Sequence, residues 1–425
     1  MVKMRILSTV LLLSGLCAPA YAEWPDGDTR SGIFSPTFHS LQIYPPENDQ
    51  LPPIIRLNSH DRLVVKFDEI ADERRYMRYQ LRHCNSAWQP DGLIETEYLD
   101  GFNEEPVEDY AYSAGTKTHY VNYSITIPNA NMCPLVSGNY LLRVYDEENP
   151  EETLLQVRFY VVEPLITMST DVTSRTDVDY NSRHQQLKIS VDAEKLDIRD
   201  YFSDLWLVIS QNSREDNQQT IAHPLRVTPP VMHFESNPAL IFPAGNEYRR
   251  FETVSTTYPG MGVESVGYAE PYYHFQLFTD TPRSDGTYNY DRTQHGRYRV
   301  REYNSSNSDT EAEYGITHFT LDMPELHNAD VFIDGDLMLR RFDPESRMVY
   351  NRATRLYEAS PLLKQGSYNY QYLVVPRNGS TTGSTALVEG DFYETVNEYM
   401  IRVYYRKPGE RYDRLVGVGT TLSGR

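Results

Sequence analysis

The fold class of this chain is decided by one stretch near its C-terminus, Gly366-Ser367-Tyr368-Asn369-Tyr370-Gln371-Tyr372-Leu373-Val374-Val375, in which tyrosines stand at i, i+2 and i+4. Side chains two residues apart lie on the same face of an extended chain, so this spacing predicts a β-strand. A second stretch of the same kind follows at 394–406. A tyrosine ring covers apolar surface while its hydroxyl stays hydrated, which predicts strands with one face in a core and one in water.

The composition extends this pattern to the whole chain, which has 34 Tyr, 15 Phe and 3 Trp among 425 residues. Strand-like alternation recurs along the sequence at 61–68, 76–83, 120–127, 138–145, 154–162, 186–191, 205–210 and 272–278. No long segment has helical periodicity. The fold class we predict is therefore all-β, with three consecutive immunoglobulin-like or early-set β-sandwich domains.

The chain divides into an export signal and three expected domains. Lys3 and Arg5 precede a short apolar run, and Ala20-Tyr21-Ala22 fits the cleavage rule, so 1–22 is a predicted signal peptide. We expect an N-terminal sandwich at 23–163, a middle sandwich at 164–303 and an early-set-like C-terminal sandwich at 304–425. The last boundary is placed at 304–313, a polar stretch that we interpret as an exposed linker.

The net charge limits the choice of partner. The formal charge is −20, and it becomes −22 when Lys3 and Arg5 leave with the signal peptide. Such a surface repels nucleic acid and anionic lipid headgroups. A basic or polar protein surface is the more suitable partner.

Two cysteines, Cys84 and Cys133, remain after signal-peptide removal. In an oxidising compartment they are candidates for a disulfide. Closing this loop would stabilise the fold by roughly 4 kcal/mol on the chain-entropy model. The alternative is two unrelated buried thiols, and the sequence leaves both open. Trp88, close to Cys84, is expected to fill a core.

Motifs for chemistry are weak. No Gly-x-Ser-x-Gly occurs, and His83 and Cys84 are neighbours whose side chains point to opposite faces of a strand. The histidines include no His-x-x-x-His pair, and there is no Cys-x-x-Cys. We therefore expect a protein that is not an enzyme, with no catalytic residues, no cofactor-binding residues and no metal ligands.

Several stretches, in order along nearly the whole chain, together resemble one family. They are Tyr79–Trp88, Glu97–Phe102, Asp109–Ser113, Pro128-Asn129, Ser137–Tyr140, Ser210–Asn212, Phe242–Arg249, Leu363–Tyr370 and Arg411–Gly417. The family is the plug protein of the bacterial type IX secretion system.

This resemblance implies a periplasmic protein that binds and seals the outer-membrane translocon barrel of the secretion system. It would associate with the outer membrane through the translocon, without inserting into the membrane and without binding nucleic acid. We expect a monomer when it is free. Tyrosine is favoured at interface cores, so the candidate partner contacts are Tyr368, Tyr370, Tyr372, Tyr404 and Tyr405.

Residues 330–375 are also similar to the early-set sandwich of glycogen-binding modules. Those modules stack sugars on exposed tryptophans, whereas the three tryptophans of this chain lie elsewhere, at 24, 88 and 206. The alternative function is accordingly a secreted polysaccharide-binding protein.

Overall fold

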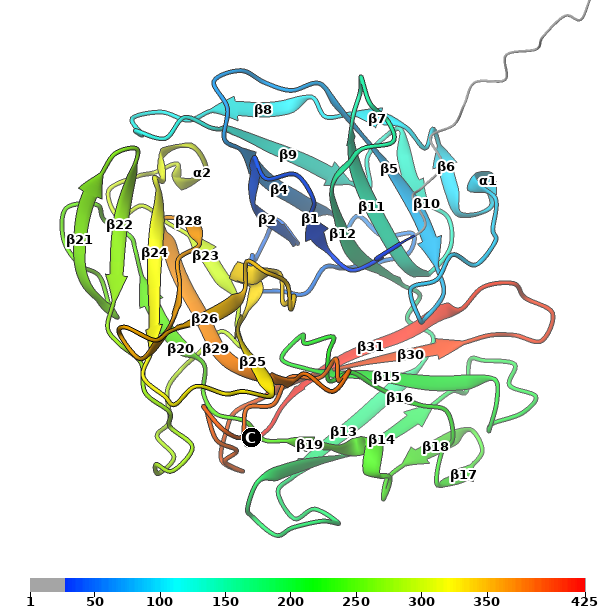
Figure 1. Cartoon of the computed structure of the whole chain (residues 1–425). Coiled ribbons are helices and arrows are strands. Elements are labelled where there is room, and N and C mark those ends of the chain that lie inside the picture. The colour runs from blue at the N-terminus through cyan, green and yellow to red at the C-terminus, as the bar shows by residue number, and fades with distance from the viewer. Residues whose placement is uncertain (1–26, 425) are drawn as a thin grey trace, which may run out of the picture.

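Three β-sandwiches form a triangle around a common centre in the computed structural model, which describes residues 27–424 (Figure 1). The predicted all-β class is confirmed. Helical structure in the described range is limited to single turns: α1 (Glu95–Tyr98), α2 (Ser308–Glu311), η1 (Pro238–Leu240) and η2 (Asp336–Met338). The predicted signal peptide, residues 1–22, lies outside the described residues.

The first sandwich packs a sheet of order β1-β12-β11-β5-β7, with β3 paired to β12, against a sheet of order β2-β4-β9-β8, and β6 and β10 form a separate ribbon. Inward residues alternate along β4 and β9, as a half-buried strand requires. The strands are β1 (Gly32–Ile33), β2 (Phe38–Tyr44), β3 (Ile54–Arg56), β4 (Leu63–Glu69), β5 (Met77–Cys84), β6 (Leu99–Gly101), β7 (Glu105–Pro106), β8 (Asp109–Tyr112), β9 (Val121–Ile127), β10 (Met132–Pro134), β11 (Gly138–Asp146) and β12 (Thr153–Val162).

The second sandwich packs a sheet of order β13-β14-β18-β17, with β19 paired to β14, against one of order β16-β15-β30-β31. Residues from both sheets share one buried apolar core. The strands are β13 (Thr167–Thr173), β14 (His184–Asp192), β15 (Leu205–Gln211), β16 (Gln219–Ile221), β17 (Arg226–Thr228), β18 (Val231–Phe234), β19 (Ile241–Pro243), β30 (Glu398–Tyr405) and β31 (Arg414–Leu422).

The third sandwich is a sheet of order β20-β29-β25-β26-β27-β24-β22-β21, with β23 and β28 attached, that folds over one core. Its strands are β20 (Arg249–Glu252), β21 (Val263–Ala269), β22 (Tyr272–Leu277), β23 (Tyr298–Val300), β24 (Tyr314–Leu321), β25 (Ala329–Asp334), β26 (Arg347–Asn351), β27 (Leu356–Ala359), β28 (Leu362–Lys364) and β29 (Gly366–Pro376).

The strand pairing does not follow the expected boundaries at 303 and 304. Strands β20 to β23 belong to the third sandwich, while β30 pairs with β15 and completes the second. The third sandwich is thus inserted between β19 and β30. The two connections lie together, because the Phe392 N–H donates to the Gly245 carbonyl at 2.8 Å. Adjacent ends allow such an insertion without strain on the host.

The polar stretch 304–313 is not the exposed linker that the sequence predicts. Its short helix, α2, lies against the first sandwich, where the Ala114 N–H donates to the Thr310 carbonyl at 2.9 Å. Its polar side chains find partners across this contact, as described below. Within residues 27–424 there is no helix long and apolar enough to cross a membrane.

Candidate functional site: the domain contacts and the groove between the first and third sandwiches

The five tyrosines proposed as partner contacts are all buried. Each is 4% exposed or less, so that interpretation is wrong: Tyr368, Tyr370, Tyr372, Tyr404 and Tyr405. The error lies in the assumption that each strand has one face exposed to solvent. In β29 both faces are covered, since the intervening Asn369 and Gln371 are buried too.

Charged groups inside the third sandwich explain why the ladder consists of tyrosine and not phenylalanine. The hydroxyls of Tyr370 and Tyr372 both donate to one Asp280 oxygen at 2.7 Å. Arg249 pairs with the other Asp280 oxygen at 2.6 Å and with Glu389 at 3.1 Å. Buried polar groups are stable when they are hydrogen-bonded in this way.

The two cysteines are free, which overturns the disulfide candidate. Cys84 is buried at the end of β5, where it pairs with Asn139, and Cys133 is exposed on β10 opposite Asp100. The two residues therefore belong to different sheets. Trp88 is buried as expected, in an apolar cluster with Met400 and Leu415 at the contact between the first and second sandwiches.

A buried ion pair joins the first sandwich to the third. Lys364 Nζ lies 2.6 Å from Asp68 Oδ2, and both side chains are almost fully buried. The Tyr314 hydroxyl donates to the same oxygen at 2.6 Å, and Lys364 lies over the Tyr120 ring at 4.1 Å. Burial lowers the pKa of Lys364, against the opposing effect of Asp68.

The segment around α2 extends this contact. Lys66 of β4 forms an ion pair with Asp309, and the Tyr120 hydroxyl donates to the Ala312 carbonyl at 2.8 Å. The Thr118 N–H donates to Glu313 at 3.1 Å. This network satisfies polar groups that desolvation would otherwise make costly.

Hydrogen bonds also join the second sandwich to both neighbours. Toward the first, the Tyr404 hydroxyl donates to Asn139 at 2.6 Å and the Ser86 N–H donates to Asp413 at 2.8 Å. Toward the third, Arg297 pairs with Glu398 at 2.5 Å. All three sandwiches are therefore in contact in pairs, which closes the triangle.

The centre of the triangle is filled by side chains from all three units. A space of about 190 Å³ remains there, lined by residues that include Leu41, Arg402 and Arg340. Arg402 bonds the Tyr160 hydroxyl and donates to Gln218 at 2.7 Å, while Arg340 donates to the His295 carbonyl at 2.7 Å. Leu41 and Leu339 also line the larger groove described next, so the two spaces adjoin.

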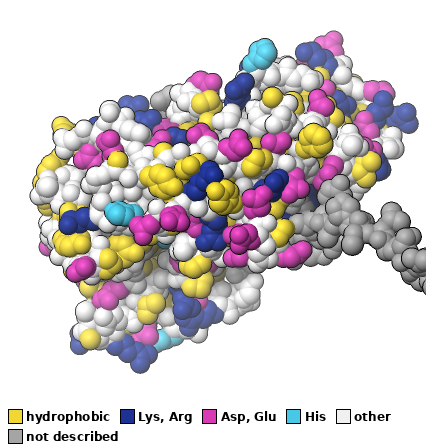
Figure 2. Space-filling model, turned by 90° about the horizontal axis from the view of Figure 1, so that it is seen from above, with side chains coloured by type: hydrophobic (Ala, Val, Ile, Leu, Met, Phe, Trp, Pro, Cys, Tyr) yellow, Lys and Arg dark blue, Asp and Glu magenta, His cyan; other side chains and the backbone are white. Residues whose placement is uncertain are grey.

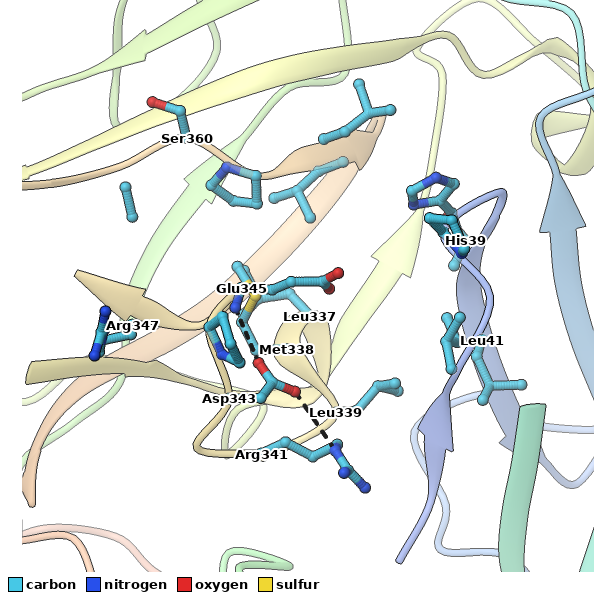
Figure 3. A pocket seen from close by; sticks show the side chains of 18 of the residues that line it. His39, Leu41, Leu337, Met338, Leu339, Arg341, Asp343, Glu345, Arg347 and Ser360 are labelled. Carbon is cyan, nitrogen blue, oxygen red and sulfur yellow. Dashed lines mark hydrogen bonds and ion pairs between the residues drawn. The ribbon is translucent and has the colours of Figure 1, made fainter. Parts of the chain in front are cut away.

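A larger groove of about 940 Å³ runs between the first and third sandwiches (Figure 3). His39 and Leu41 come from β2 on one wall, whereas Met338 and Glu345 come from η2 and the following loop on the other. Apolar and polar side chains share the lining about equally. A groove of this kind suits the binding of a chain segment or an apolar group.

Two titratable groups of the groove, His39 and Glu345, come from its two different walls. Burial and the neighbouring Asp343 raise the pKa of Glu345, and burial lowers the pKa of His39, in part against Asp68. Figure 3 places His39 and Glu345 on opposite walls, and Asp343 is held by Arg341 at 3.5 Å. Over residues 27–424, no group of three His, Cys, Asp or Glu side chains is arranged to hold a metal.

Sequence reasoning missed the residues that hold the triangle together, above all Lys364 and Asp68. Each carries a signal that could have been used. Lys364 follows two leucines directly before the tyrosine ladder, and Asp68 ends the apolar strand at 63–67. A charge at the buried end of an apolar strand predicts a charged partner, but its identity requires the fold.

Comparison with known proteins identifies a family for the chain. A family model described as the type 9 secretion system plug protein 1st domain matches residues 38–163. The chain belongs to the type IX secretion system plug protein family. The matched range covers the first sandwich from β2 to β12. The chain thus has a role in type IX secretion, and its family is a component of that machinery.

A crystal structure of a hypothetical protein from Parabacteroides merdae ATCC 43184, at 2.30 Å resolution, is similar over the whole fold. Its TM-score is 0.91 at 40% identity, over 93% of this chain and 99% of that chain. Pseudomonas fluorescens alkylpurine DNA glycosylase AlkC bound to abasic-site DNA gives a TM-score of 0.17 at 13% identity, over 29% of this chain and 30% of that one, which is no basis for inference. No curated protein matches the sequence.

Proposed function

We propose that this chain is a periplasmic plug that binds the outer-membrane translocon barrel of the type IX secretion system and closes its pore. It acts by occupying space and catalyses no reaction. Family membership supports the secretion context, and the predicted signal peptide at 1–22 supports export.

The observation that carries this proposal is that all three sandwiches contact one another in pairs. A stopper for a wide pore must not come apart at its domain contacts. The buried Lys364–Asp68 ion pair joins the first and third sandwiches, and hydrogen bonds and a further ion pair join the second sandwich to each of them.

Size fits the same role. A compact body of about 400 residues has a radius of gyration of about 21 Å, and hence a diameter of roughly 55 Å. The three sandwiches thus present a broad face, where one sandwich alone would cover much less. The formal charge, −22 after removal of the predicted signal peptide, favours contact with a basic rim.

A pull-down from solubilised outer membranes tests the proposal. The tagged protein should recover the very large barrel protein of the translocon, and repeated absence of that protein would contradict the binding role. Removal of the plug should also make the envelope more permeable to bulky antibiotics. Unchanged sensitivity in a strain with active secretion would contradict the sealing role.

The alternative, polysaccharide binding, gains little support from the third sandwich. Stacking on sugar needs exposed rings. The ladder at 366–375, which carries part of the likeness to glycogen-binding modules, has its three tyrosines in the core. We therefore do not adopt this function.

A further inference from the structure

One motif of the family resemblance lies mostly at the surface, with only Tyr110 packed against the first core. Asp109–Ser113 contains β8, in which Asp109, Ala111 and Tyr112 are exposed, in contrast to the buried tyrosine ladder. Figure 1 shows β8 at the outer rim of the first sandwich. A strand that contributes so little to a core suggests a role at the surface.

The outer edge of β8 is free. β8 ends the sheet of order β2-β4-β9-β8, and among residues 27–424 no strand pairs with its other side. The Ser113 N–H donates to the Tyr120 carbonyl at 2.8 Å, and Ala111 lies opposite Asn122 two residues earlier. Hydrogen-bonded pairs alternate in an antiparallel ladder, so the N–H and C=O groups of Tyr110 and Tyr112 point outward. Such an edge can pair with another strand.

An aromatic and cationic cluster stands beside this edge. The Arg74 guanidinium lies 4.5 Å from the ring centre of Tyr76 and 4.8 Å from that of Tyr110. Tyr110 also contacts Tyr112 edge to face at 5.8 Å. Tyr76 is 60% exposed and Tyr112 50% exposed. Tyrosine and arginine are the residues most enriched at binding hot spots, and here their side chains already hold one another in place.

The surroundings are acidic. Glu73 precedes Arg74, Glu108 and Asp109 begin the β8 region, and all three are exposed. Figure 2 shows the face at the top of Figure 1, where hydrophobic, basic and acidic side chains lie next to one another. Opposite potentials across an interface favour association, so an extended segment that carries Lys or Arg suits this edge.

We propose that the outer edge of β8 takes up a basic, extended segment of the translocon barrel protein as an added strand, with the Arg74, Tyr76, Tyr110 and Tyr112 cluster as its anchor. Backbone pairing with Tyr110 and Tyr112 supplies affinity, and the tyrosine rings supply specificity. This inference rests on the proposed function and names the surface that performs it.

The test measures binding of the full-length protein to the purified translocon barrel in detergent, by biolayer interferometry. Tyr112→Pro removes a backbone N–H that points away from the sheet and donates no hydrogen bond to a neighbouring strand. Edge strands tolerate proline at such a position. Tyr76→Ala removes an anchor ring, and the double variant Glu108→Lys with Asp109→Lys reverses the local charge. Each should weaken binding about tenfold or more. If Tyr112→Pro does not fold, as judged by its melting temperature, the other two variants still decide.

The matched control is Tyr180→Ala in the second sandwich. Tyr180 is 65% exposed and also lies against an arginine, Arg175, at 5.3 Å. This variant should bind as the wild type does. In addition, amide hydrogen exchange at Tyr110 and Tyr112 should slow in the complex, as direct evidence of strand pairing.

The outcomes separate the two proposals. If the wild type does not bind the barrel, both the proposed function and this inference fail. If the wild type binds and all edge variants bind equally well, only the β8 edge is ruled out. A concentration-dependent dimer that the edge variants abolish would show that the edge pairs with a second copy of this chain, which would also overturn the inference.

Discussion

At the scale of single residues, the tyrosines of β29 act through their hydroxyls as much as through their rings. Tyr370→Phe or Tyr372→Phe removes one donor from the partly buried Asp280, which each contacts at 2.7 Å. A lost bond to a charged group costs about 1.5–3 kcal/mol. Urea unfolding should show this loss, whereas Tyr290→Phe, at a site 62% exposed, should change the free energy of unfolding by less than about 0.5 kcal/mol. Equal effects at all three positions would contradict the buried network.

Glu389 gives the fold a defined acid sensitivity. Burial raises its pKa, but Arg249 and Arg283 outweigh that effect, and the net pKa lies below its ordinary 4.5. A carboxyl group with a lowered folded pKa stabilises the protein above its unfolded pKa and loses this contribution as the pH falls through the folded value. The wild type should therefore lose stability as the pH falls below about 4.5.

Glu389→Gln should cost about 3–5 kcal/mol at neutral pH, because it leaves two arginines without their buried partner. Its free energy of unfolding should also depend less steeply on pH in the acid range. Denaturant titrations from pH 7 to pH 3 provide both quantities. An unchanged acid slope would contradict the role of this carboxylate.

The thiols should differ in reactivity. Burial raises the pKa of Cys84 to about 12, and burial with Asp100 raises that of the exposed Cys133. Iodoacetamide at pH 8 should label Cys133 slowly in the native protein and Cys84 only after unfolding, since the thiolate is the reactive form. Peptide mass spectrometry without reduction checks this, and a Cys84–Cys133 cross-linked peptide would contradict it.

At the scale of elements, the second sandwich should fold only when β30 and β31 are present. The fragment 164–303 lacks both strands and exposes its core, so it should not give a cooperative melt. Residues 164–245 joined by a short glycine linker to 392–424 should fold, because Gly245 and Phe392 are hydrogen-bonded neighbours. Thermal unfolding of the two fragments, followed by circular dichroism, shows which of them folds cooperatively. A cooperative melt of 164–303 would contradict the observed pairing.

The sequence predicts individual strands well and their assembly poorly. The alternation at 61–68 marks β4, and that at 205–210 marks β15, because a period of two depends only on neighbouring residues. The pairing of β15 with β30 joins segments about 190 residues apart, and no local signal specifies it. The polar stretch 304–313 was misjudged for the same reason, since its partners lie in the first sandwich.

For the candidate site, too, the sequence predicts local features better than contacts between distant segments. Residue type correctly predicted a buried Trp88, because tryptophan buries a large apolar area in almost any context. Residue type wrongly predicted that the tyrosines lie on the surface. A tyrosine in a strand can lie in the core when a carboxylate such as that of Asp280 accepts a hydrogen bond from its hydroxyl. Which face of a strand is exposed to solvent depends on the neighbouring sandwich.

At the scale of the whole molecule, the closed triangle should behave as one body in solution. Its radius of gyration from small-angle X-ray scattering should be close to the roughly 21 Å of a compact chain of this length. Lys364→Met leaves the buried Asp68 without its cationic partner, which costs about 3–5 kcal/mol, and should expand the particle as the first and third sandwiches separate. Arg352→Met breaks an ion pair with Glu325 in which the arginine is 81% exposed, and it should leave the scattering curve unchanged. An extended curve for the wild type would contradict the triangle.

The central claim is that this body closes a pore by filling it. The most direct measurement is the ionic conductance of the purified translocon barrel in a planar lipid bilayer, with the protein added from the periplasmic side. The account predicts that open barrels close when the protein is added and reopen when it is washed away. Unchanged conductance, under conditions where the protein is shown to be bound, would contradict it.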